Sequence, residues 1–279
     1  MEPRIIFEDS EILVLDKPAG IVVNRSDTTV GEKTVQEWVE AHLVIPSLFR
    51  DPCSNEMLKR VQHDTKETDF YKRAGIVHRL DKETSGILLV AKNPQSFENL
   101  QKQFKERRVK KTYIALVHGK VEFKEGEINV PVGRLPWNRK RFGVLAGGRE
   151  AVTRYKVLRS VILSSAMQNE GSNEILRFAQ NDRGAGDIKN ESLTLLELYP
   201  ETGRTHQIRV HLKYLNHSIF ADPLYAGRKT ARNDRKILPR IFLHASKISF
   251  YHPKTGKLIY FESELPNQLR QFLGDLQHS

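Results

Sequence analysis

The sequence predicts an α+β fold in which a mixed or antiparallel sheet is flanked by helices. Three observations predict it: short apolar runs bounded by turn residues, a few stretches with the apolar period of about 3.6 residues, and several strands that follow one another directly. The chain has 279 residues, of which 39% are hydrophobic, so it can form a sizeable core. We expect one domain over residues 1–279.

The expected strands are short apolar runs. The run ILLVA is apolar throughout, as is typical of a strand buried on both faces. Lys17, Pro18 and the two residues after them read as the turn that follows the second strand. The expected strands cover residues 4–8, 12–15, 87–91, 112–117, 128–132, 153–158 and 193–199.

The expected helices have recognisable starts. Thr34 and Glu37 have the spacing of a capping box, in which each side chain bonds to the backbone N–H of the other residue. Asn93 before Pro94 is a second start, because proline is favoured at the first helical position. Thr205 is a candidate cap for a third helix. The expected helices cover residues 34–43, 94–104, 205–216 and 265–273.

Two polar, weakly periodic stretches, residues 45–72 and 160–191, are longer than ordinary connections. They also resemble each other, since residues 55–64 read NEMLKRVQHD and residues 173–182 read NEILRFAQND. Our hypothesis is that both are insertions of a related translated repeat element into surface loops, where insertions are tolerated.

The charge balance favours a polyanionic partner. Lys and Arg total 45 against 34 for Asp and Glu, a net charge of +11, which favours nucleic acid although many basic proteins bind nothing anionic. The single cysteine, Cys53, excludes a disulfide framework within the chain. With neither a signal peptide nor an apolar run of membrane-spanning length, we expect a cytoplasmic protein without membrane contact.

Several common cofactor and nucleophile motifs are absent. The sequence contains no GxxxxGK[ST], GxGxxG or GxSxG pattern. His206 and His211 are five positions apart, which on a helix separates them by about 140° and makes them a poor ligand pair. We therefore expect neither a metal nor a cofactor.

Residues 77–92, VHRLDKETSGILLVAK, place a polar run directly before an apolar strand. Asp81 would then lie in a loop held by a buried strand, a common position for catalytic groups. The alternative is that Asp81 and Glu83 are merely solvated loop charges.

A second polar run, ETGRTHQIRVH, covers residues 201–211. Arg204 precedes the expected helix, and His206 and Arg209 lie on its first turn. Arg204 is of a type that holds a carboxylate ionised through a bidentate pair. The alternative is a solvated helix start.

The run HRLDKETSG, followed by ILLVAKN, resembles the signature of the RluA-type pseudouridine synthases. His78 fits this type better than the related RsuA type, which usually has glycine there. The resemblance covers nearly the whole chain, although Ala221 stands where glycine is commoner. Because the chain begins directly with the first motif, we expect no N-terminal accessory RNA-binding domain. Further resembling blocks cover residues 5–22, 111–119, 202–212, 221–227 and 243–256.

The resemblance implies isomerisation of uridine to pseudouridine in RNA, on a catalytic domain with a bent sheet. Asp81 would be the catalytic aspartate, which either attacks the nucleotide covalently or assists glycosidic cleavage. Arg204 would pair with it, and Tyr113 would lie against the target base and serve in proton transfer. Because a stacked uracil is inaccessible, the base must be flipped out.

Further residues would contact the RNA. Arg79 would fill the gap left by the flipped base, or else form a structural ion pair. His78 would contact RNA or support its own loop. The predicted RNA-contacting residues are His78, Arg79, Thr84, Lys111, His206 and Arg209.

Three basic stretches, residues 102–111, 134–141 and 228–240, would together form a phosphate-tracking surface. We therefore predict a monomeric enzyme acting on structured RNA, either rRNA or tRNA. One alternative is a catalytically inactive RNA-binding protein or RNA chaperone on the same fold. Another is a phosphoryl-transfer enzyme using Asp16, which is disfavoured because no second acid follows two residues later.

Overall fold

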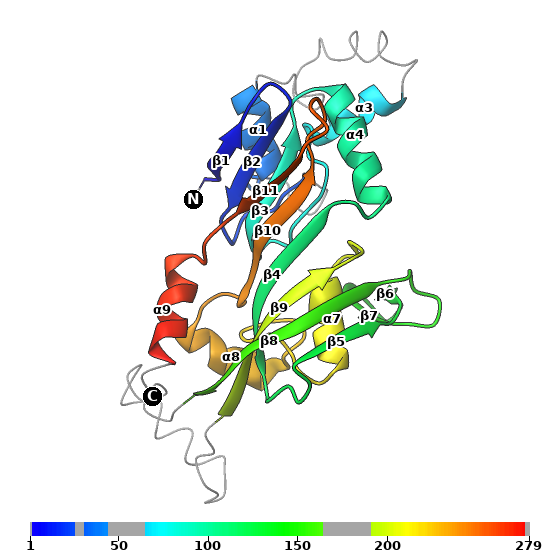
Figure 1. Cartoon of the computed structure of the whole chain (residues 1–279). Coiled ribbons are helices and arrows are strands. Elements are labelled where there is room, and N and C mark those ends of the chain that lie inside the picture. Colours follow the sequence, from blue (N-terminus) through cyan, green and yellow to red (C-terminus); the bar gives the residue numbers. More distant parts are fainter. Residues whose placement is uncertain (1, 26–30, 44–64, 164–190, 277–279) are drawn as a thin grey trace, which may run out of the picture. The chain divides into compact units, whose positions relative to one another are not determined.

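A computed structural model describes residues 2–25, 31–43, 65–163 and 191–276 (Figure 1). Its contacts divide the chain into two compact units, a division that the sequence does not predict. Unit 1 comprises Met1–Lys111 and Ala245–Glu264, and unit 2 comprises Thr112–His244 and Leu265–Ser279. Both units combine helices with strands that pair antiparallel, so the predicted α+β class is confirmed.

The sheet of unit 1 contains β1 (Arg4–Glu8), β2 (Ile12–Lys17) and β3 (Ser85–Ala91), each paired antiparallel with the next. It also contains β11 (Leu258–Glu262), which pairs antiparallel with β10 (Leu243–Tyr251). Every residue of β3 is buried, as its apolar run predicts.

Gly86, at the start of β3, allows a close approach of β10. Its φ is +113°, and a Cβ at this position would lie 2.2 Å from the carbonyl oxygen of Ala245. Only glycine fits such a contact without moving backbone. The glycine of the TSGILL run is therefore needed for packing between two backbones.

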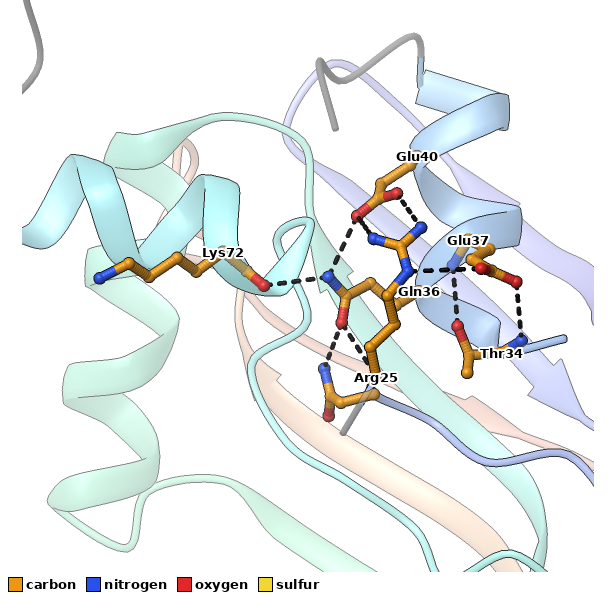
Figure 2. Close-up of polar contacts among 7 residues, drawn as sticks. Arg25, Thr34, Gln36, Glu37, Glu40 and Lys72 are labelled. Carbon is orange, nitrogen blue, oxygen red and sulfur yellow. Dashed lines mark hydrogen bonds and ion pairs between the residues drawn. The ribbon is translucent and has the colours of Figure 1, made fainter. Parts of the chain in front are cut away.

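Helix α1 (Val35–Leu43) begins with the predicted capping box. The Glu37 N–H donates to Thr34 Oγ1 at 3.2 Å, and the Thr34 N–H donates to Glu37 Oε2 at 3.3 Å (Figure 2). These reciprocal bonds satisfy two N–H groups at the helix start that have no partner within the helix.

Helix α4 (Pro94–Lys105) also begins as predicted, since Asn93 Oδ1 accepts from the Ser96 N–H at 2.8 Å. Its apolar face, which includes Phe97 and Leu100, packs into the core of unit 1. The other buried members of this core cluster are Ile12, Val14, Phe70, Val77, Ile87, Leu89, Ala91, Val109, Ile248 and Phe250.

A polar network joins α1 to α3 (Thr65–Arg73) and to the segment after β2 (Figure 2). Arg25 forms a bidentate ion pair with Glu40, in which Nη1 donates to Oε1 at 2.8 Å and Nη2 donates to Oε2 at 2.6 Å. Gln36 Nε2 donates to Glu40 Oε1 at 3.0 Å and to the carbonyl oxygen of Lys72 at 2.9 Å. Bidentate geometry makes the arginine–carboxylate pair strong, so it fixes the segment around Arg25 against α1.

In unit 2, the strand order is β4 (Lys110–His118), β9 (Glu191–Pro200), β8 (Val152–Leu163) and β5 (Glu125–Asn129), all antiparallel. The strands expected at 112–117, 153–158 and 193–199 lie within β4, β8 and β9, and β8 and β9 extend further than expected.

A separate two-stranded hairpin follows β5, formed by β6 (Val132–Leu135) and β7 (Asn138–Val144). The single strand expected at 128–132 is therefore wrong, because β5 ends at Asn129 and β6 begins at Val132. Pro131 lies between them and has no N–H to continue a ladder.

Among the described residues of unit 2, the helices are α7 (Gln207–Tyr214), α8 (Arg228–Ile237) and α9 (Asn267–Asp275). Helix α9 lies within two residues of the expected 265–273. Apolar residues of α9, among them Leu269 and Phe272, pack in the core of unit 2. Over the residues described, the structure contains no helix long and apolar enough to cross a membrane.

The predicted bounds of both insertions are too wide. Phe70, on α3, is 3% exposed and packs in the core of unit 1. Val161 and Leu163 are buried in unit 2, where β8 continues to pair with β9. The two ten-residue repeats, 55–64 and 173–182, lie outside the described residues.

We predict that residues 164–190 are dispensable for folding. Leu163 pairs directly with Glu191, so an Asn-Gly turn can join β8 to β9. Replacing 164–190 with Asn-Gly should leave the thermal unfolding midpoint unchanged or higher, because a shorter loop loses less entropy on closure. A lower midpoint in differential scanning calorimetry would contradict the insertion hypothesis.

Candidate active site

The loop that carries Asp81 is held by Lys17, the fully buried last residue of β2. Lys17 Nζ donates to the carbonyl oxygens of Pro18 at 2.9 Å, Ile21 at 2.8 Å and Lys82 at 3.1 Å. The Lys82 oxygen also accepts from the Gly20 N–H at 2.8 Å. The ammonium has an acceptor for each of its three donors, so the residue next to Asp81 is clamped to the β2 turn.

Asp81 itself is partly buried in this loop, and its carbonyl oxygen accepts from the Thr84 N–H at 3.1 Å. Thr84 is 2% exposed, so burial favours a structural role for it over RNA contact. Arg79 is exposed, which fits the predicted contact with RNA. One loop with a fixed backbone thus carries a partly buried aspartate and an exposed arginine.

His78 supports the same loop from its other end. Its Nε2 accepts from the Leu89 N–H on β3 at 3.0 Å, which requires a neutral ring with its proton on Nδ1. The ring packs on Phe104, with centroids 5.1 Å apart. Burial, and secondarily the charge of Lys111, lowers the pKa of His78 to about 3. These contacts favour the local structural role among the two alternatives for His78.

Lys111 is the other polar member of this cluster. Its ammonium lies 6.0 Å from the centroid of the Phe104 ring, and burial lowers its pKa to about 8. Residues two apart on a strand share a face, so Lys111 lies on the same face of β4 as Tyr113. The sequence predicts that Lys111 contacts RNA as part of a phosphate-tracking surface, whereas in the structure its amine is desolvated by burial.

Tyr113 lies in unit 2, where it pairs across the sheet with Leu198 of β9. It is partly buried and packs against the apolar cluster that includes Leu196 and Ile208. Its ring is therefore held on a rigid strand, as a stacking role requires.

The loop that carries Arg204 is fixed by Gln207, which is 4% exposed. Gln207 Oε1 accepts from Thr202 Oγ1 at 2.7 Å and from the Arg204 N–H at 3.0 Å. Its Nε2 donates to the Val152 carbonyl oxygen at 2.9 Å and to Thr153 Oγ1 at 3.0 Å. Gln207 therefore joins the loop to the start of β8, with two bonds to each.

The predicted cap at Thr205 is wrong. Helix α7 begins at Gln207, and its N-cap residue is His206, which is left-handed with φ 56° and makes no side-chain cap bond. The Arg204 N–H donates to the side chain of Gln207, which is the first residue of the helix. The polar side chain that organises this turn therefore belongs to the helix and does not precede it.

Arg204 is partly exposed, and its Nε donates to the carbonyl oxygen of Glu150 at 2.9 Å. This bond orients the guanidinium within unit 2. Asp81 belongs to unit 1, so the pairing of Asp81 with Arg204 stays a prediction.

Arg209 and His206 contact residues of the block 221–227, which reads ADPLYAG. Arg209 is 7% exposed, forms a bidentate pair with Asp222 at 2.8 and 2.9 Å, and lies over the Tyr225 ring. His206 Nδ1 lies 2.9 Å from Tyr225 Oη, which also accepts from the Phe142 N–H of β7 at 3.1 Å. Burial and pairing favour a structural role for Arg209 over RNA contact.

Sequence reasoning missed Lys17, Gln207, Asp222 and Tyr225 as organising residues. The motifs that contain them were recognisable, but their roles depend on contacts distant in the chain. His211, dismissed as a metal ligand, is buried between Thr153 Oγ1 and the Val130 carbonyl oxygen. Within the described part of the chain, no group of three or more His, Cys, Asp or Glu side chains is placed to hold a metal ion.

Comparisons with known proteins define the class of protein that carries these loops. The family model described as RNA pseudouridylate synthase matches residues 11–214, which include Asp81, Tyr113 and Arg204. The human RNA pseudouridylate synthase domain containing 1 has the same fold, with a TM-score of 0.61 and 23% identity over 100% of this chain and 96% of that one.

The chain belongs to the RNA pseudouridylate synthase family and is of the RluA type. It is 34% identical to the ribosomal large subunit pseudouridine synthase D of Nitrosomonas europaea, over 99% of this chain and 67% of that protein. It is 33% identical to the uncharacterised RNA pseudouridine synthase YlyB of Bacillus subtilis, over 99% of this chain and 74% of that one. The predicted class of enzyme, an isomerase that acts on RNA, is confirmed.

We predict that Lys17→Met lowers the free energy of unfolding by about 2–4 kcal/mol, because three part-buried carbonyl oxygens lose the ammonium from which they accept. Lys82→Met is the matched control, since the one interaction of the Lys82 side chain with the described residues is an exposed ion pair with Glu32. Exposed pairs contribute about 1 kcal/mol or less. Urea denaturation measures both variants, and equal losses would argue against the clamp.

We also predict that His78 makes stability pH-dependent. Its folded-state pKa of about 3 lies below the ordinary 6.5, so its contribution is full above pH 6.5 and is lost as pH falls towards 3. His78→Gln retains an acceptor for the Leu89 N–H but does not titrate. Between pH 6.5 and 5, wild type should lose about 1–2 kcal/mol more than this variant. Unfolding free energies are measured in urea at each pH. If those of wild type and His78→Gln change in parallel with pH, His78 is not the titrating group.

Proposed function

We propose that Asp81 is the catalytic aspartate of pseudouridine formation in structured RNA, and that Arg204 keeps it ionised. The observation that carries the proposal is the Lys17 clamp, which holds the backbone beside Asp81 through the Lys82 carbonyl oxygen. A nucleophile or ion-pair stabiliser must be held in a defined geometry to act, and this loop is held at both ends.

The reaction is an isomerisation, so pseudouridine has the same composition as uridine. The bond between N1 of uracil and C1′ of ribose breaks, the base turns, and a bond forms between C5 and C1′. The proton on C5 leaves and N1 gains a proton. Asp81 would act on the nucleotide either by covalent attack or by stabilising glycosidic cleavage.

Tyr113 and Arg79 have distinct parts in this proposal. Tyr113 presents a ring to the flipped uracil and a phenol that can serve in proton transfer at C5. Arg79 is exposed on the Asp81 loop and would occupy the gap that the flipped base leaves in the RNA.

We take large-subunit ribosomal RNA as the first substrate to test, with tRNA as the alternative. The Nitrosomonas relative is named for the ribosomal large subunit, which supports this order. As the sequence predicts, the proposed enzyme acts in the cytoplasm as a monomer.

We predict that Asp81→Asn abolishes pseudouridine formation and changes the RNA dissociation constant by less than threefold. The amide keeps the side-chain volume but removes the charge that reacts. The assay measures tritium released from an RNA transcript labelled at uracil C5. Glu83→Gln is the matched control, an acid of the same loop that should retain activity. Undiminished release by Asp81→Asn would exclude the mechanism and favour another catalytic group.

A further inference from the structure

Helix α8 sorts the basic residues of the 228–240 stretch into two groups. The inward group is used within unit 2. Arg235 donates to the carbonyl oxygens of Ala221 at 3.4 Å and Pro239 at 2.9 Å. Arg240 is 9% exposed and donates to carbonyl oxygens of neighbouring residues. These two arginines stabilise the fold and are not available to a partner.

The inward face of α8 is fixed by Ala231 and Asp234 and by Leu238, which follows the helix. Ala231 is 5% exposed and Leu238 is 1% exposed. Asp234 Oδ2 accepts from the Ala221 N–H at 3.0 Å and lies 2.9 Å from His118 Nε2. Asp234, the one acid of the helix, is therefore turned away from solvent and neutralises none of the outer charges.

The outward face carries the second group, which consists of Arg228, Lys229, Arg232 and Lys236. These side chains lie within an arc of roughly 100° on the helix, opposite the buried face. All four are exposed, and none forms an ion pair with another residue that the structure describes. Over roughly 12 Å of helix axis they form a single cationic strip. We call it the α8 strip: Arg228, Lys229, Arg232 and Lys236.

The α8 strip is unfavourable for the helix that bears it. Arg228 and Lys229 lie in the first turn, where the helix dipole disfavours cations, and that turn has no acidic residue. Arg228 with Arg232, and Arg232 with Lys236, are like-charge pairs four residues apart, which also destabilise a helix. Removing these charges would make the isolated element more stable. A polyanionic partner relieves both repulsions.

We propose that the α8 strip binds the phosphate backbone of the RNA substrate, in addition to the contacts proposed for the Asp81 and Arg204 loops. The inference rests on the proposed function for the identity of the polyanion. A membrane surface fits less well, because Ala231 is buried and Ile237 packs against the core, so the apolar residues of α8 do not flank the cations. A duplex presents several phosphates over the length of the strip.

The test compares two variants that each lose four positive charges. The first changes all four residues of the α8 strip to Gln, which retains helix propensity. The control changes four exposed lysines elsewhere to Gln. The control positions are Lys120, Lys124, Lys254 and Lys257.

Binding of an unmodified large-subunit ribosomal RNA transcript is measured as a function of salt. In the α8 variant, the slope of log affinity against log salt should become shallower by roughly 3, as expected for four lost phosphate contacts. Its dissociation constant should rise at least tenfold, while the control changes both quantities little. The thermal midpoint of the α8 variant should equal or exceed that of wild type.

Three results would overturn the proposal. The salt slope of the α8 variant could equal that of wild type, the two variants could lose equal RNA affinity, or the thermal midpoint of the α8 variant could fall below that of wild type. Tighter binding of wild type to phosphatidylglycerol vesicles than to the transcript would overturn it in favour of a membrane. Tritium release by wild type is measured in parallel. If wild type forms no pseudouridine while the salt slopes of wild type and the α8 variant still differ, the proposed function is refuted but RNA binding by the α8 strip is supported.

Discussion

The buried ammonium of Lys17 is the interaction on which the organisation of unit 1 depends. A buried cation is costly unless every donor finds an acceptor, and here three backbone carbonyl oxygens supply them. Two of these carbonyls belong to the turn after β2, and the third belongs to Lys82. Because the three must converge on one atom, the turn and the Asp81 loop cannot move independently.

Unit 2 uses an amide in the same way. Gln207 donates and accepts two bonds each, which joins the Arg204 loop to the start of β8. A network in which every group is satisfied rigidifies its surroundings, whereas one missing partner leaves a buried polar atom. Both predicted catalytic loops are thus anchored by a buried polar side chain to backbone of their own unit.

Local signals in the sequence predicted most of the strands and the starts of two helices. The Thr34–Glu37 capping box and the Asn93 cap involve residues three positions apart, so the pattern contains the whole interaction. Helix α8 was missed because cations dominate it and its buried face has few apolar residues. Asp234 is held in that face by hydrogen bonds to distant backbone and to His118, which no local pattern reveals.

The candidate site was predictable in its residues more than in their roles. The motif resemblance indicated Asp81 and Arg204 as site residues. Arg209 and Thr84, which it indicated as RNA contacts, are buried. The partner of Arg209 is Asp222, thirteen positions away in the sequence. Lys17 lies next to a recognised turn, yet its bond to Lys82 spans 65 residues. Such long-range pairs follow from the fold and have no spacing that a sequence displays.

The most direct test of the clamp is the single-turnover rate of pseudouridine formation by Lys17→Met, measured with saturating RNA at a temperature where the variant is fully folded. If Lys17 positions the Asp81 loop, the rate should fall at least tenfold while the RNA dissociation constant changes little. A rate equal to that of wild type would show that Asp81 works without the clamp and would contradict this account.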